Sequence, residues 1–117
     1  MSNIVRAAIL QTEWTGDSES MVEKHVKYAE QAAADGAQVM CFQEIFNTPY
    51  FCQVQENEHF DSAEPIPDGP TMQRMIQLAK DTEMVIVVPM FEKADEGFFY
   101  NTAAVIDADG TYLGKYR

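Results

Sequence analysis

Apolar residues recur along this chain with periods that change several times, and each change marks a predicted element. The segment NIVRAAILQT at residues 3–12 is almost continuously apolar, which is typical of a strand with both faces covered. Residues 18–35 instead place apolar side chains every three or four positions, which predicts an amphipathic helix. The segment QVMCFQE at residues 38–44 predicts a second strand. Together they predict a βαβ unit with parallel, adjacent strands.

Local signals indicate the ends of the first helix and its buried side. Ser20 and Glu23 have the spacing of a capping box near the start, and Gly36 suits the C-terminal end. His25 is expected to be a partly exposed surface residue. The stripe expected to face the sheet consists of Val22, Val26, Ala29 and Ala33.

A long irregular segment then separates the second strand from a second helix. Residues 45–70 contain four prolines and the turn signal Asp68-Gly69. A connection of this length is more often functional than merely connecting. Thr71 is expected to cap a helix that extends to Asp81. The buried side of this helix is expected to comprise Met72, Met75, Ile76 and Ala79.

The last part of the chain predicts three further strands. MVIVVPMFEK at residues 84–93 is a third apolar strand, in which Pro89 indicates an edge or a bulge near the strand end. Residues 98–106 and the residues from Thr111 onward predict a hairpin around the turn DADG. The chain is therefore expected to adopt an α/β fold, with a mixed sheet of five strands and two helices. Two helices leave one face of such a sheet poorly covered. We therefore expect residues 1–117 to be the front part of one domain, truncated at its C-terminal side.

Composition and charge exclude several classes of function. The chain has 8 basic and 19 acidic residues, for a net charge of −11, and its basic residues form no cluster, so binding to nucleic acid is disfavoured. The longest apolar run, residues 84–91, is too short to cross a bilayer. The N-terminus lacks the features of a secretory signal. We therefore expect a cytoplasmic protein without a membrane or nucleic-acid partner.

The cysteines and histidines offer no recognisable metal site. Cys41 and Cys52 form no C-x-x-C pair, so a reduced, cytosolic setting fits them. His25 and His59 have no metal-ligand spacing with the cysteines. We expect no metal and no cofactor.

Glu44 is the residue most suited to chemistry. It is expected at the carboxyl end of the second strand, where ligands bind in open α/β sheets. The long loop that follows would line such a site with Phe46, Tyr50 and Phe51. Desolvation there would raise the pKa of the carboxyl group toward that of a general base. From position alone, a structural carboxylate is favoured over a catalytic one, because most strand-end carboxylates cap backbone or pair with arginine.

A resemblance to a known family strengthens the catalytic interpretation. The segments RAAILQT, AAADGAQVMCFQEIF and YNTAAVIDADGTYLGKYR, in this order, resemble the carbon–nitrogen hydrolase (nitrilase) superfamily over essentially the whole chain. Members usually carry PE where this sequence has Gln43-Glu44. That variant, followed by TPYFCQVQ, is similar to the N-carbamoyl amide hydrolase branch, which contains β-ureidopropionases and N-carbamoylputrescine amidases. The resemblance implies an α-β-β-α sandwich, of which this chain is the N-terminal part, and a homo-oligomer.

The resemblance also implies a Glu–Lys–Cys mechanism, of which only the glutamate, Glu44, is present here. The family lysine follows GKYR directly, so Lys115 within that motif matches a non-catalytic lysine, and the nucleophilic cysteine lies further on. Cys52 is expected to line the pocket with Tyr50 and Phe51. Cys41 is expected to be a small core residue on the face opposite Glu44.

Two further polar residues have open roles. Glu92 ends the third strand, where it either faces the same site as Glu44 or forms a surface ion pair. Asn101 matches the YN of the family and is expected to fix backbone geometry rather than to touch substrate.

The expected function of the parent protein is hydrolysis of a non-peptide C–N bond in an N-carbamoyl amine or N-carbamoyl β-amino acid, with this 117-residue chain inactive alone. Another amidase or nitrilase of the superfamily is one alternative. A non-catalytic fragment that binds a partner is another. A plain flavodoxin-like domain is disfavoured because no Gly-rich phosphate loop follows the first strand.

Overall fold

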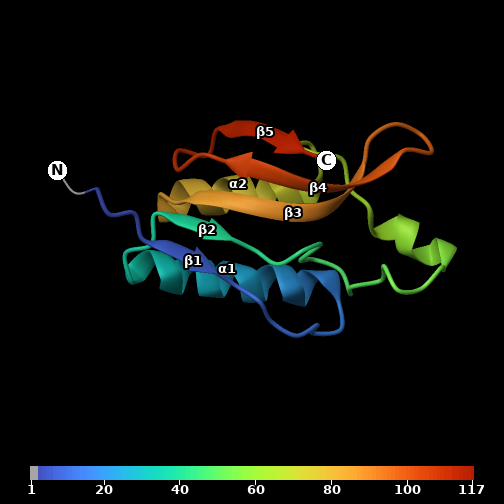
Figure 1. Ribbon diagram of the computed structural model, residues 1–117, viewed down its shortest axis with the longest axis horizontal. Coiled ribbons are helices and arrows are strands. Elements are labelled where there is room, and N and C mark those ends of the chain that lie inside the picture. The colour runs from blue at the N-terminus through green and yellow to red at the C-terminus, as the bar shows by residue number, and fades with distance from the viewer. Residues whose placement is uncertain (1–2) are drawn as a thin grey trace.

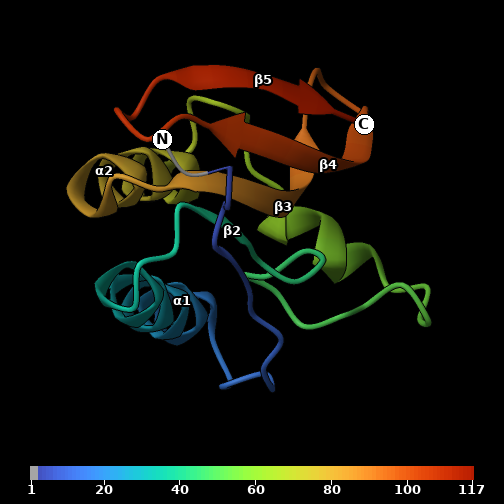
Figure 2. The ribbon, with the colours of Figure 1, turned by 60° about the vertical axis from the view of Figure 1, so that its left-hand side comes forward.

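The computed structural model describes residues 3–117, which form a five-stranded mixed sheet with both long helices on one face (Figures 1 and 2). The elements in chain order are β1 (Ala7–Ile9), α1 (Ser18–Ala34), β2 (Val39–Cys41), the 3₁₀ helix η1 (Asn57–Ser62), α2 (Pro70–Thr82), β3 (Val85–Lys93), β4 (Phe99–Ile106) and β5 (Tyr112–Tyr116). The α/β class, the mixed sheet and the two helices predicted from the sequence are confirmed.

The sheet has the strand order β1-β2-β3-β4-β5. The first three strands are parallel, with Ala8 opposite Met40 and Met40 opposite Ile86. β3 and β4, and then β4 and β5, pair antiparallel. The predicted βαβ unit and C-terminal hairpin are thus both present. β3 continues through Pro89, which pairs with Ala103 of β4 and lies past Val87, the last β3 residue that pairs with β2. Pro89 therefore occupies an edge position relative to β2, where its missing N–H costs no ladder hydrogen bond, and not a bulge.

Both helix starts differ from the predicted caps. The side chain of Asp17 caps α1 by accepting a hydrogen bond from the Ser20 amide at 2.7 Å, so the predicted capping box is wrong. α2 begins at Pro70 rather than at Thr71. The Thr71 amide donates to Glu64 at 2.9 Å, so a carboxylate from the preceding loop satisfies the start of this helix.

The hydrophobic core lies between the helices and one face of the sheet. Its fully buried side chains include Ala29 from α1, Met72, Met75 and Leu78 from α2, and Ile86, Val88, Met90, Ala104 and Ile106 from the sheet. The opposite face, called the open face below, is covered by neither α1 nor α2 (Figure 2). The 3₁₀ helix η1 contacts one end of it, where Phe60 packs on Phe91 and Phe99. On it Ile9 is 88% exposed and Tyr116 is 82% exposed. The predicted uncovered face is therefore present.

His25 is buried completely, which contradicts its predicted surface position. α1 is rotated so that Met21 and His25, one turn apart, face the core beside Val26. The ring packs against Phe42 and Phe46 at centroid distances of 4.9 and 4.7 Å. Nδ1 lies 2.8 Å from the Met21 carbonyl, whereas Nε2 has no hydrogen-bond partner among the described residues. Desolvation by burial lowers the pKa of His25.

None of the helices in residues 3–117 is both long and apolar enough to cross a membrane.

Candidate active site

Glu44 lies in a tight turn after β2 rather than on the strand itself. β2 ends at Cys41, and the turn holds Ile45 at a φ of 42°, in the left-handed region that β-branched residues rarely adopt. Ile45 and Phe46 are buried, and the Phe46 amide donates to the Pro89 carbonyl at 3.2 Å. The turn is therefore anchored to the core, with Glu44 directed outward. The expected desolvation of Glu44 is not found, because its side chain is exposed over the open face.

Asn101 holds the carboxylate of Glu44. Its Nδ2 donates a hydrogen bond of 2.6 Å to Glu44 Oε1, across 57 positions of sequence. On β4 the neighbouring Thr102 is buried on the helix side, so Asn101 points to the open face. The expected backbone role of Asn101 is wrong, because the partner shown is a side chain. The alternation of buried and exposed residues along β4 could have placed Asn101 on the open face, but nothing in the sequence identified Glu44 as its partner.

The open face is hollowed around Glu44. One hollow of about 380 Å³ is lined by Gln11, Thr12, Gln43, Glu44 and Tyr50. Its walls are tied together because Gln43 Oε1 accepts a hydrogen bond from the Thr12 amide at 2.6 Å. The loop after β1 and the turn after β2 thus meet at the carboxyl ends of two parallel strands, where the sequence predicted a ligand site.

Cys41 is not the core residue that was expected. It is half-buried on the open face, between Ile9 and Val87 in the sheet, and lines a hollow together with Glu44. The strand ends at Cys41, so the turn interrupts the alternation on which the prediction rested. Burial raises the pKa of the Cys41 thiol.

Of the three predicted pocket residues, Tyr50 and Phe51 line two different hollows, and Cys52 lines neither of these two. Tyr50 lines the Glu44 hollow, and a side-chain hydrogen bond with Cys52, followed by the charges of Cys52 and Glu44, raises the pKa of Tyr50. Tyr50 and Cys52 therefore lie on the Glu44 side. Phe51 instead lines a second cavity and stacks on His59 at a centroid distance of 4.9 Å.

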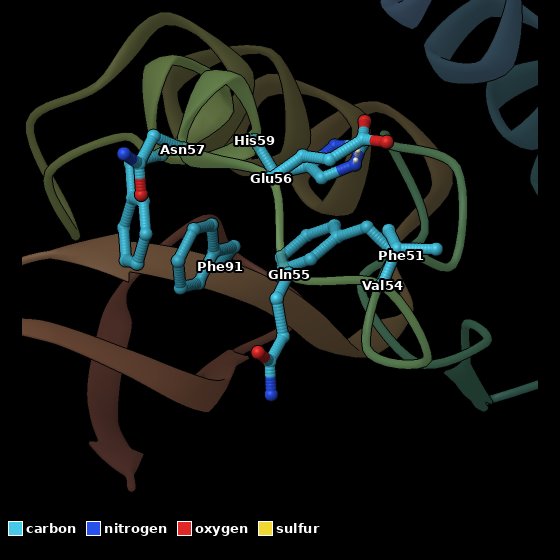
Figure 3. Close-up of a pocket in the computed structure, with 8 residues that line it drawn as sticks. Phe51, Val54, Gln55, Glu56, Asn57, His59 and Phe91 are labelled. Carbon is cyan, nitrogen blue, oxygen red and sulfur yellow. Dashed lines mark ion pairs between the residues drawn. The ribbon is translucent and has the colours of Figure 1, made fainter.

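This second cavity, called the aromatic cavity below, has a volume of about 240 Å³ (Figure 3). Its lining consists of Phe51, Val54, Gln55, Glu56, Asn57, His59, Phe60 and Phe91. The Phe91 ring lies 4.9 Å from Phe51 and 5.9 Å from Phe60 between centroids. Sequence reasoning missed this cavity, because Phe91 comes from β3 and the other residues from the irregular segment.

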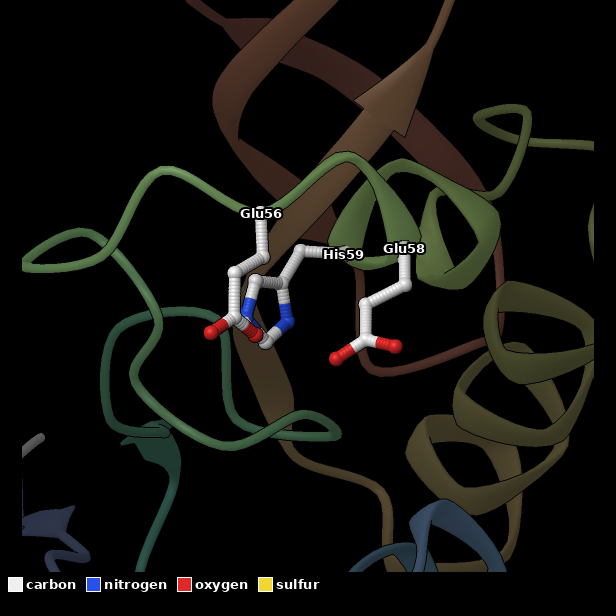
Figure 4. Close-up of side chains that lie close together, drawn as sticks. All are labelled: Glu56, Glu58 and His59. Carbon is white, nitrogen blue, oxygen red and sulfur yellow. Dashed lines mark ion pairs between the residues drawn. The ribbon is translucent and has the colours of Figure 1, made fainter.

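Two carboxylates and an imidazole gather beside the aromatic cavity (Figure 4). Glu56, Glu58 and His59 bring one ligand-type atom each to within 4.8 Å of the others. His59 Nε2 lies 3.6 Å from Glu56 Oε2, and both glutamates are exposed. The group gives the rim of the cavity a negative charge.

Glu92 belongs to a separate, buried ion-pair network, so its expected place beside Glu44 or in a surface pair is wrong. It accepts hydrogen bonds from Arg117 Nε at 2.7 Å, from Thr102 at 3.0 Å and from Lys115. Desolvation acts to raise the pKa of Glu92, but the hydrogen bonds from Arg117, Lys115 and Thr102 and the charge of Lys115 outweigh it and lower this pKa to about 2. Glu92 lies on the helix side of the sheet, whereas Asn101 lies on the open face.

Residues 6–117 match the profile of the Carbon-nitrogen hydrolase family. The chain is 42% identical over 99% of its length to an N-carbamoylputrescine amidase of Solanum lycopersicum, and 42% identical over 92% of its length to one of Arabidopsis thaliana. These matches cover 38% and 36% of the two relatives, so the chain spans less than two fifths of their length.

The structural comparison agrees with this match. The crystal structure of a carbon–nitrogen hydrolase from Helicobacter pylori G27 superposes with a TM-score of 0.85 at 26% identity. The superposition covers 97% of this chain and 39% of that one. The mixed sheet with both helices on one face is therefore the nitrilase-type arrangement.

Proposed function

This chain belongs to the carbon–nitrogen hydrolase family, and from that premise we propose that the full-length protein hydrolyses a non-peptide C–N bond of an N-carbamoyl amine. The observation that carries the proposal is the carboxylate of Glu44, aimed over the open face and held by Asn101 at 2.6 Å. The substrate class follows the relatives, which are N-carbamoylputrescine amidases at 42% identity.

In the proposed reaction Glu44 is the general base. It takes the proton of a cysteine thiol, and the thiolate attacks the carbonyl carbon of the carbamoyl group to form a covalent intermediate. Glu44 returns the proton to the leaving group and then activates the water that hydrolyses the intermediate. A lysine stabilises the oxyanion. The family resemblance implies the cysteine and the lysine, and we propose that both belong to the part of the full-length protein outside these 117 residues. The net products are the amine, carbon dioxide and ammonia.

Tyr50, Phe51 and Cys52 are proposed as substrate-binding residues. Tyr50 supports this role most directly, since it lines the same hollow as Glu44. Cys52 supports it through its hydrogen bond with Tyr50. Phe51 would contact a more distant part of the substrate from the aromatic cavity.

The test is to express the full open reading frame that contains these 117 codons and to measure ammonia release. N-carbamoylputrescine, N-carbamoyl-β-alanine, a simple amide and a nitrile form the substrate panel. We expect turnover of an N-carbamoyl substrate, lost by a factor of about 100 or more in Glu44→Gln, with Glu30→Gln on the exposed side of α1 as the matched control. Turnover of only the amide or the nitrile would favour another hydrolase of the superfamily. Absence of turnover would favour a non-catalytic binding role.

We also propose a cytoplasmic homo-oligomer. Cys41 and Cys52 are both free thiols, which is consistent with a reducing compartment, and the oligomer is supported by the family resemblance alone. Light scattering on the full-length protein and cell fractionation test the two parts separately.

A further inference from the structure

We propose that the aromatic cavity binds a short alkyl chain that ends in an ammonium group, so that it selects substrates with a cationic tail. The inference rests on the proposed function, because the carbamoyl end of the same substrate would lie at Glu44. Glu56, Phe60 and Phe91 would then be residues that determine specificity.

The aromatic cavity and the Glu44 hollow are lined by different residues, but these residues are neighbours at two places. Phe91 and Asn101 are directly opposite each other on β3 and β4, so their Cα atoms are about 5 Å apart. Phe91 lines the aromatic cavity, whereas Asn101 holds Glu44. In the loop, Tyr50 lines the Glu44 hollow and the next residue, Phe51, lines the aromatic cavity. In the proposed binding mode, a linear substrate extends across these two neighbouring positions, with its carbamoyl end at Glu44 and its tail in the aromatic cavity.

The lining of the cavity suits both the alkyl chain and the ammonium group of such a ligand. The rings of Phe51, Phe60 and Phe91 offer apolar contact for methylene groups and negative π faces for a cation. The carboxylate of Glu56 is 58% exposed at the rim, where it can pair with an ammonium group that keeps part of its hydration. No lysine or arginine is present in this lining among the described residues.

The charge around the rim discriminates against an acidic tail. Glu58 adds a second carboxylate close to Glu56 (Figure 4). His59 is the one basic side chain of the group, and its ring is stacked on Phe51. A substrate that ends in a carboxylate would be repelled by these two carboxylates. The cavity therefore favours N-carbamoyl amines over N-carbamoyl β-amino acids. The cavity volume of about 240 Å³ accommodates a chain of a few methylene groups.

Binding can be measured without catalysis. Saturation-transfer difference NMR on the full-length protein would compare 1,4-diaminobutane with butanoate, which have chains of the same carbon number. We expect transfer to the diamine alone, reduced at least threefold in Glu56→Gln and in Phe60→Leu and unchanged in Glu30→Gln. Glu56 and Phe60 are exposed enough that neither variant disturbs the core. Equal transfer to both compounds, or a diamine signal that neither cavity variant reduces, would overturn the inference.

A kinetic experiment then separates this inference from the proposed function. Glu56→Gln is expected to raise KM for N-carbamoylputrescine about fivefold and to leave KM for N-butylurea, which lacks the ammonium group, unchanged. If the parent enzyme hydrolyses both compounds and Glu56→Gln changes neither KM, the cavity inference fails and the function stands. If the parent enzyme hydrolyses neither compound, the proposed function fails, and the NMR titration alone decides whether the cavity binds amines.

Discussion

At the scale of single residues, Glu44 is oriented by neighbouring residues that take no part in the proposed reaction. The left-handed conformation of Ile45 costs about 1–2 kcal/mol for a residue with a Cβ, and burial of Ile45 and Phe46 sustains it. Strain of this kind persists only where the surrounding structure imposes it, and it concentrates at functional sites. Asn101 then fixes the carboxylate itself. Both features direct one side chain over the open face.

We predict that Asn101→Ala lowers kcat of the full-length enzyme by about tenfold to a hundredfold and leaves KM nearly unchanged. The reason is that the variant frees the Glu44 carboxylate to rotate, and loss of alignment in a reacting group costs rate rather than binding. Steady-state kinetics with an N-carbamoyl substrate measures both constants. Gln77→Ala is the control, because within residues 3–117 the side-chain amide of Gln77 bonds only Asp81, on the exposed side of α2. An unchanged kcat in Asn101→Ala would contradict a positioning role.

His25 predicts a dependence of stability on pH. Burial lowers the pKa of His25 from its usual 6.5, so the unfolded chain takes up a proton at a pH where the folded protein does not. Folding stability is therefore complete above about pH 6.5 and decreases as the pH falls below this value.

We expect the urea midpoint of the full-length protein to fall between pH 7.5 and pH 5.5, and to fall less in His25→Leu. The variant keeps an apolar side chain between Phe42 and Phe46 and removes the group that titrates. His59→Gln is the matched control, since it changes the other histidine of the chain, outside the core. The same decrease in His25→Leu as in the parent protein would assign the pH dependence to other groups.

At the scale of elements, Glu92 links the last strand to the middle of the sheet. Its side chain reaches from β3 across β4 to Lys115 and Arg117, and the Arg117 guanidinium also lies 4.1 Å over the Tyr100 ring. The carboxylate is buried, whereas Lys115 is 27% exposed and Arg117 is 41% exposed at the side chain. The network therefore fastens β5, an edge strand of five residues, from the helix side.

We predict that Glu92→Gln destabilises the protein by about 2–3 kcal/mol at pH 7, somewhat below the cost of breaking a fully buried pair. Because the pKa of Glu92 is lowered to about 2, its contribution is complete above about pH 4.5 and is lost as the pH falls toward 2. The difference in unfolding free energy between parent and variant should shrink over that range. Glu96→Gln in the exposed turn before β4 should be neutral. A difference in unfolding free energy between parent and variant that stays constant down to pH 2 would contradict the ionised pair.

Periodicity predicted the order of the elements but not the full extent of their buried sides or their ends. The 3.6-residue repeat identified α1 and its stripe, since Val22, Val26, Ala29 and Ala33 all pack on the core. The prediction did not show that the buried side is wide enough to include His25 as well. The apolar run through Glu44 suggested a strand of seven residues, whereas β2 comprises only Val39–Cys41. Turn geometry such as the φ of Ile45 leaves no trace in a pattern of apolar positions.

The candidate site could be predicted only in its local part. Glu44 was identifiable from its place after a strand and from the motif around it. Its partner Asn101 and the cavity residue Phe91 come from strands that join the site only when β3 and β4 pair. Contacts of this kind depend on which residues of paired strands stand opposite each other, and the local periodicity of each strand taken alone does not reveal that.

At the scale of the whole molecule, the open face is the dominant feature. The strands are covered by α1 and α2 on one side only, while Ile9 and Tyr116 are largely exposed on the other (Figure 2). Apolar faces of this kind are covered in stable proteins. We propose that in the full-length protein the second sheet of an α-β-β-α sandwich packs on this face, with residues 1–117 supplying the N-terminal part of that domain.

Two opposite effects of one substitution would test that proposal. In the polypeptide 1–117 alone, the bare face and the edges of the sheet should drive self-association, and Ile9→Lys should shift sedimentation toward the monomer. In the full-length protein Ile9 should be buried against the second sheet, so Ile9→Lys should destabilise it by about 3 kcal/mol or more, because an unpaired charge is buried. Phe98→Lys changes an apolar side chain that is exposed in the turn before β4, and it should have little effect in either setting. A full-length protein that tolerates Ile9→Lys would mean that the face stays open to solvent, and the site around Glu44 would then have no covering layer from which to exclude water.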